Sequence, residues 1–77
     1  MFIMLHEMIS LERTRETYIN VDDIQRFAWH DGKTTEDGLV LPGSTILTFR
    51  SGFTRNFEIT ERPEEILQKI KEAKGVK

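Results

Sequence analysis

The stretch over residues 44–75 constrains the fold most, because it encodes a β-hairpin that runs directly into a helix. Residues 44–50 are rich in β-branched and aromatic side chains, and residues 53–59 alternate between apolar and polar ones. Both patterns are typical of half-buried strands. Ser51-Gly52 between them predicts a tight turn. The sequence therefore predicts two neighbouring antiparallel strands.

A helix over 63–74 is expected to follow this hairpin. Pro63 suits its first turn, where a backbone N–H would have no partner inside the helix. Acidic residues lie near its start and lysines near its end, which complements the helix dipole. Apolar residues recur at helical spacing, namely Ile66, Leu67, Ile70 and Ala73. A helix with one apolar stripe is expected to pack across one face of the preceding strands.

The N-terminal half predicts three further strands, each bounded by polar residues. His6-Glu7 interrupts the first, which predicts a bulge or a strand that pairs only over its later part. Asn20 predicts either the cap of a single helical turn or an Asx turn, and both alternatives stay open. The strands expected over the whole chain are 2–11, 16–20, 24–30, 45–50 and 53–59.

Residues 31–43 form a long connection for a small protein, and long connections are often functional. Glycines and a proline within it predict turns. Leu39, Val40 and Leu41 lie inside this polar segment. They predict either an additional short strand or an apolar loop tip that contacts a partner.

The composition limits the classes of protein that the chain can represent. Seventy-seven residues suffice for a single small domain over 1–77, whose modest core makes a homo-oligomer a reasonable expectation. The net charge of −2 disfavours a protein that mainly coats nucleic acid, and the absence of cysteine excludes disulfides. There is no signal-peptide core and no apolar run of about 20 residues. We therefore expect a soluble, cytoplasmic protein without membrane insertion.

No set of residues predicts catalysis. His30 and Asp31 are neighbours at the end of a predicted strand, where the side chains of adjacent residues point to opposite faces. No serine has a base beside it, and neither histidine has the spacing of a metal ligand. An enzyme would need His6 or His30 brought next to a carboxylate by the fold, which we do not expect. The sequence predicts no catalytic residue, no metal site and no cofactor.

The turn of the C-terminal hairpin carries a candidate contact for nucleic acid or a nucleotide. Arg50 and Arg55 flank it and Phe53 lies between them. Arginine beside an exposed aromatic ring can grip nucleic acid, although a solvated hairpin tip explains the same residues. A two-residue turn would place Arg50 opposite Phe53 and Ile46 opposite Phe57. A slip of one residue would exchange the two faces.

Several positions also match the pattern of a known family. They are Tyr18-Ile19-Asn20, Ile24, residues 46–52, Glu61, Glu64-Glu65-Ile66 and Ile70. In their order the chain resembles the small FlbD/SwrD-like family of flagellar and phage proteins. The resemblance implies support of the flagellar motor or a phage role, and it carries over no catalytic residue. The longer loop over 31–43 departs from the family pattern. A weaker similarity to LytTR-type DNA-binding domains supports the nucleic-acid alternative.

These observations predict an α+β fold: an antiparallel β-meander of four to five strands, with one C-terminal amphipathic helix packed on one face. Phe27, Trp29, Phe49 and Phe57 are expected under the helix. The predicted function is a non-enzymatic interaction or accessory protein that binds a protein partner through a sheet edge and the 31–43 loop. The alternative is a nucleic-acid or nucleotide-binding module. The candidate contact residues are Trp29, Leu39, Leu41, Arg50, Phe53 and Arg55.

Overall fold

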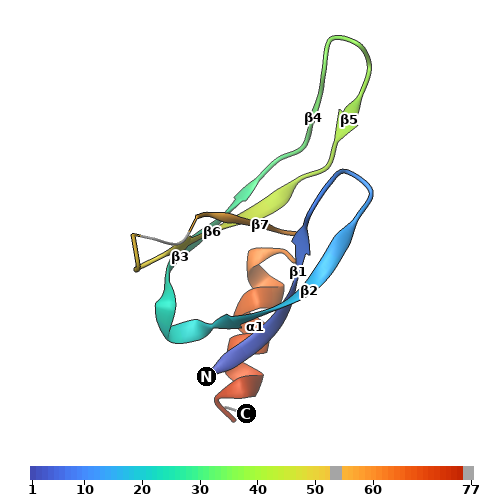
Figure 1. Cartoon of the computed structure of the whole chain (residues 1–77). Coiled ribbons are helices and arrows are strands. Elements are labelled where there is room, and N and C mark those ends of the chain that lie inside the picture. The colour runs from blue at the N-terminus through green and yellow to red at the C-terminus, as the bar shows by residue number, and fades with distance from the viewer. Residues whose placement is uncertain (53–54, 76–77) are drawn as a thin grey trace.

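The computed structural model describes residues 1–52 and 55–75. It shows a five-stranded antiparallel sheet followed by one α-helix, which confirms the predicted α+β class (Figure 1). The strand order is β2-β1-β7-β6-β3, and a two-stranded sheet of β4 and β5 stands apart. The elements are β1 (Phe2–Met8), β2 (Thr14–Asn20), the 3₁₀ turn η1 (Val21–Asp23), β3 (Ile24–His30), β4 (Lys33–Thr34), β5 (Val40–Leu41), β6 (Ser44–Phe49), β7 (Phe57–Ile59) and α1 (Pro63–Ala73).

The sheet is strongly curled, because the chain joins its two edge strands directly. β2 and β3 lie at opposite edges, yet only the three residues of η1 connect them. Strands lie about 4.8 Å apart, and a residue spans about 3.5 Å at most, so a flat sheet of this order could not be bridged. The Asn20 side chain accepts a hydrogen bond from the Asp22 N–H at 3.2 Å. Asn20 therefore caps the 3₁₀ turn through a bond to the residue two positions on, which is also the bond of an Asx turn.

The core fills the concave side of this sheet, and α1 closes it. The helix packs against β1 and β3, on the two sides of the curl. It contributes the buried Ile66, with Ile70 packed behind it. Leu67 is 49% exposed and Ala73 is exposed as well, so the apolar stripe is narrower than predicted. The buried apolar residues are Ile3, Leu5, Ile19, Ile24, Leu47, Phe49, Ile59 and Ile66.

The aromatic residues divide between the core and its margin. Phe49 is buried, and the Phe57 ring meets it edge to face with the centroids 5.2 Å apart. Phe27 packs against the core while partly buried. Trp29 is half-buried and lies outside the core cluster, whereas Phe49 belongs to the cluster and Phe27 and Phe57 pack against it.

The predicted register of the C-terminal hairpin is wrong by one residue. Phe57 lies opposite Leu47, and Ile46 lies opposite Glu58. In this register Leu47 and Phe57 both face the core, while Glu58 faces outwards. The predicted pairing of Ile46 with Phe57 would put Leu47 and Phe57 on opposite faces of the sheet, so that one of the two would leave the core. The connection is longer than the predicted two-residue turn, because β6 ends at Phe49 and β7 begins at Phe57.

The first strand also differs from its prediction. β1 ends at Met8 instead of residue 11, and the chain turns over residues 9–13, where the Ile9 N–H donates to the Arg13 carbonyl at 3.0 Å. β1 pairs with β2 from Phe2 to Met8 in an uninterrupted register. The bulge predicted at His6-Glu7 is therefore absent, because both polar side chains find partners within the regular strand.

Candidate functional site

Residues 31–43 form an arm that extends beyond the sheet. β4 and β5 continue the β3–β6 hairpin outwards, as Figure 1 shows. No residue of the arm is buried, and its apolar residues Leu39 and Val40 are 47% and 70% exposed. Of the two alternatives that the sequence left open, the short strand is present as β5, whereas the tip of the arm is the polar turn over residues 35–38 and Leu39 and Val40 follow it on the returning side.

The tip of the arm is held by its own hydrogen bonds. The Thr35 N–H donates to the Leu39 carbonyl at 2.8 Å, and the Leu39 N–H donates to the Thr35 hydroxyl at 3.1 Å. The same hydroxyl donates to the Asp37 carboxylate, and this bond lowers the pKa of Asp37. Gly38 closes the turn with a φ of 84°, a backbone angle that residues with a side chain rarely adopt. The arm is thus an ordered hairpin outside the core.

Trp29 marks the base of the arm. Its indole N–H donates to Asp31 at 2.9 Å, and the Arg62 guanidinium lies 4.3 Å from the centre of its ring. A Cβ at Gly43 would lie 2.4 Å from the ring, so only glycine permits this approach. Trp29 therefore links β3, the returning strand and the start of α1 at the point where the arm leaves the domain.

A groove of about 450 Å³ runs along the base of the arm. Leu41, Pro42 and Ile46 supply its apolar surface. Charged and polar side chains surround this surface, from His30, Asp31, Lys33, Ser44 and Glu58. A volume of this size with a few polar groups is typical of sites for small molecules or short peptide segments.

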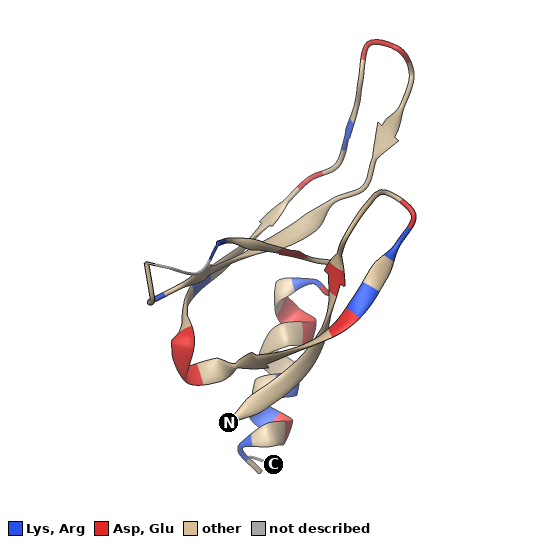
Figure 2. Cartoon of the chain, viewed as in Figure 1, with Lys and Arg blue, Asp and Glu red and all other residues tan. Residues whose placement is uncertain are grey.

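The predicted contact residues separate into two groups. Trp29, Leu39 and Leu41 belong to the arm and its base, as described above. Arg50 and Arg55 lie beyond the other end of β6, where Figure 2 shows the basic positions of that loop. Arg55 is 3.7 Å from the Glu7 carboxylate and its guanidinium lies 5.8 Å from the Phe57 ring centre. Phe53 lies outside the described residues.

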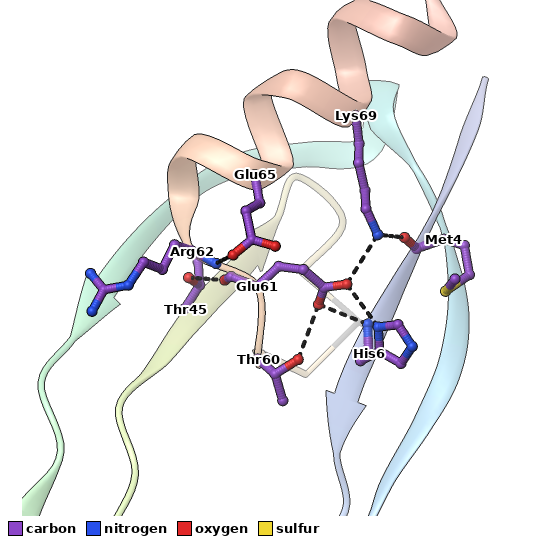
Figure 3. Close-up of polar contacts among 8 residues, drawn as sticks. All are labelled: Met4, His6, Thr45, Thr60, Glu61, Arg62, Glu65 and Lys69. Atoms are coloured by element: carbon purple, nitrogen blue, oxygen red, sulfur yellow. Dashed lines mark hydrogen bonds and ion pairs between the residues drawn. The ribbon is translucent and has the colours of Figure 1, made fainter.

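A polar cluster around Glu61, absent from the predictions, joins the first strand to the helix (Figure 3). The buried Glu61 carboxylate accepts hydrogen bonds from the His6 N–H at 2.9 Å and from Thr60 at 3.2 Å. It also lies 2.8 Å from the His6 Nδ1 and 3.0 Å from the Lys69 amine. Lys69 donates further to the Met4 carbonyl at 2.7 Å. These residues, His6, Thr60, Glu61 and Lys69, form the Glu61 cluster.

The Glu61 cluster replaces a missing length of strand. β7 ends at Ile59, so on the side of β1 that faces away from β2 no strand of the described chain lies beside the backbone of Met4 and His6. The Thr60 N–H continues the pairing there, by donating to the His6 carbonyl at 3.0 Å. The Glu61 carboxylate accepts from the His6 N–H, and the Lys69 amine donates to the Met4 carbonyl. These two side chains supply the partners that a longer β7 would have given to the β1 backbone. The Thr45 hydroxyl donates to the Glu61 carbonyl at 2.6 Å and fixes the same residue to β6.

The cluster strongly favours the ionised form of Glu61. Burial by itself would raise the pKa of this carboxyl. The hydrogen bonds from the His6 backbone, the His6 ring and Lys69 outweigh that effect and lower the pKa to about 2. The expectation that no histidine would lie next to a carboxylate is therefore wrong. His6 and Glu61 are 55 residues apart, so local spacing carries no signal of their contact.

A second buried carboxylate, Glu7, is held by the neighbouring strand. Arg15 donates to it at 3.1 Å and the Thr17 hydroxyl at 3.2 Å. Glu7 lines a pocket of about 270 Å³ together with Arg15 and Arg55. Among the described residues, every buried polar side-chain atom has a partner, and no group of three acidic, histidine or cysteine residues could hold a metal ion. Nor is any helix in this part long and apolar enough to cross a membrane.

No protein-family model, curated protein or solved structure gives a significant match to this chain. The FlbD/SwrD-like resemblance therefore stays a prediction from the residue pattern. The arm and the groove at its base are the candidate functional site on the geometry alone.

Proposed function

We propose that this chain is a non-enzymatic interaction protein that binds a partner protein through the arm and the groove at its base. The carrying observation is that an ordered hairpin displays Leu39 and Val40 to solvent and adds nothing to the core. Ordering a residue costs about 1–2 kcal/mol, and an isolated two-stranded hairpin is marginally stable. A partner that covers these side chains would offset this cost.

The arm offers two kinds of contact to such a partner. In the described chain β4 and β5 pair only with each other, so their outer backbone edges can accept an added strand. The groove beside them offers Leu41 and Ile46 to an apolar side chain. An extended segment of the partner, with apolar residues flanked by polar ones, matches both features.

The resemblance to the FlbD/SwrD-like family suggests where this partner occurs. A flagellum-associated or phage-encoded role in the cytoplasm would make the partner a flagellar or phage protein. The proposal of an interaction module does not depend on this assignment, because it rests on the arm.

The test is capture of partners from a host lysate with two matched variants. Leu39→Glu introduces a charge on the arm, and Leu67→Glu introduces the same charge on α1 at a side chain of similar exposure, 47% against 49%. We expect Leu39→Glu to weaken binding of the captured protein about tenfold or more, equal to about 1.4 kcal/mol, and Leu67→Glu to leave it unchanged. Circular dichroism of both variants checks that each is folded. Equal binding by Leu39→Glu and the wild type would contradict the proposal.

The same capture distinguishes the nucleic-acid alternative. Arg55 is exposed beside an aromatic ring, which favours a contact with bases or phosphates. The alternative predicts capture that is lost with nuclease and falls steeply with salt, because phosphate contacts release counterions. Arg55→Glu would then abolish binding while Leu39→Glu would not.

A further inference from the structure

β2 is an edge strand with no bulge and no proline to interrupt its pairing, although it carries Arg15 and Glu16. It has seven residues, lies at one end of the strand order, and pairs among the described elements only with β1. The opposite edge strand, β3, has a register shift between Ile24 and Arg26 and packs against α1. Proteins normally protect edges with such devices, and an edge without them invites pairing.

The hydrogen-bonding pattern identifies the free groups of β2. The Val21 N–H donates to the Met1 carbonyl and the Ile9 N–H donates to the Arg13 carbonyl. In an antiparallel ladder, bonded positions alternate, so the odd-numbered residues of β2 bond to β1. The backbone groups of the even-numbered Thr14, Glu16 and Tyr18 then point away from the sheet, towards a further strand.

Exposed apolar side chains lie beside this edge. Tyr18 is 69% exposed and lies opposite Met4, on the outer face of the sheet. Phe2, on the same face of β1, is 63% exposed. An added strand would therefore cover apolar surface as well as satisfy backbone groups.

We infer that β2 pairs antiparallel with β2 of a second copy of this chain, about a two-fold axis at Thr17. This axis aligns all seven residues of the strand and keeps inner and outer faces matched. It places Glu16 opposite Tyr18 of the second copy and Arg15 opposite Ile19. An axis at Arg15 or Glu16 would instead place two like charges directly opposite each other, which is destabilising. The two Tyr18 rings become diagonal neighbours, within reach of each other.

The strand is thus complementary to itself in its best-aligned register, which favours a second copy over an unrelated strand. The resulting pair is isologous and closes on itself, so it forms a dimer and not a fibre. This inference is independent of the arm, which belongs to the other sheet.

The test measures molar mass by light scattering over a wide range of protein concentration. We expect the wild type to dimerise. Glu16→Pro should remain monomeric, because it removes an outward N–H without breaking a bond to β1. Tyr18→Glu should weaken dimerisation, and Val40→Glu, at a side chain of equal exposure on the arm, should not. A monomeric wild type at the highest concentration, or a Glu16→Pro variant that dimerises as the wild type does, would overturn the inference.

A cysteine variant tests the register. The chain has no cysteine, and two Thr17 residues on the axis would form a non-hydrogen-bonded pair with Cα atoms about 4.5 Å apart, within disulfide range. We expect Thr17→Cys to give a covalent dimer under mild oxidation and Val40→Cys, though more exposed, to give much less. Equal cross-linking of the two would contradict the Thr17 axis. Loss of dimerisation in Glu16→Pro with partner capture intact would separate this inference from the proposed function.

Discussion

Two carboxylates, Glu7 and Glu61, are buried in this small protein with 5% and 6% of their surface exposed. Burial of a charge is costly unless donors surround it, and each of these carboxylates has several. Glu7 and Arg15 are cross-strand neighbours in a hairpin, so their contact follows from local pairing. The contacts of Glu61 with β1 depend on the whole fold.

Glu61 should make stability depend on acid pH. Its pKa is about 2 in the folded protein against an ordinary value of 4.5, so the unfolded chain binds more protons between these values. The stabilisation is complete above about pH 4.5 and is lost as pH falls towards 2. We expect Glu61→Gln to lower the free energy of unfolding by about 2 kcal/mol at neutral pH. Urea unfolding repeated at successively lower pH values should show a progressively smaller difference between the variant and the wild type.

Glu64→Gln is the matched control, because Glu64 is exposed in the first turn of α1. This substitution should lower the free energy of unfolding by only a few tenths of a kcal/mol, because it weakens the interaction with the helix dipole. A Glu61→Gln variant as stable as Glu64→Gln across this pH range would show that the Glu61 cluster does not stabilise the fold.

At the scale of elements, α1 contacts the sheet through a narrow stripe. Ile66 is fully buried in the core, whereas its neighbour Leu67 is half-exposed. The helical period of the sequence places Ile66 and Leu67 in one apolar stripe, but it does not determine how much of that stripe is buried. The curl of the sheet decides that width, because only one ridge of the helix enters the concave side.

The two adjacent positions should therefore respond differently to truncation. We expect Ile66→Ala to lower the free energy of unfolding by about 2–5 kcal/mol, as a cavity in the core does. Leu67→Ala should cost less than about 1 kcal/mol, because its side chain loses little buried surface. Urea denaturation of both variants measures the difference, and equal losses would mean that both side chains lie in the core.

The hairpin of β6 and β7 illustrates how far local pattern reaches. Both strands were predictable, because each carries β-forming residues with alternation. Their register was not, because the turn chemistry of Ser51-Gly52 suggested a shorter connection than the chain makes. The register satisfies the core instead, by placing Leu47 opposite Phe57.

At the scale of the whole molecule, the arm lies outside the core of the domain. The core cluster includes no residue of the arm, and the principal extents of 45 × 30 × 19 Å describe an elongated molecule. The core cluster therefore forms without apolar residues from the arm.

Replacement of residues 33–41 by Asn-Gly should consequently leave a folded domain. We expect cooperative thermal unfolding, with the midpoint within about 8 °C of the wild type, because a change of about 1 kcal/mol moves it by roughly that amount. Capture of the partner protein should be lost in the same variant. Loss of the cooperative transition would show instead that the arm is part of the folding unit.

The sequence by itself determined the α+β class, most strand positions and the start of the helix at Pro63. These properties depend on periodicity, turn residues and helix caps, which act over a few neighbouring residues. Only the tertiary structure decided the β1–β7 pairing, the hairpin register, the Glu61 cluster and the position of Trp29 at the base of the arm. The β1–β7 pairing, the Glu61 cluster and the contacts of Trp29 join segments that are distant in the chain. The hairpin register joins neighbouring strands, but it too follows from closing one curled sheet around one core.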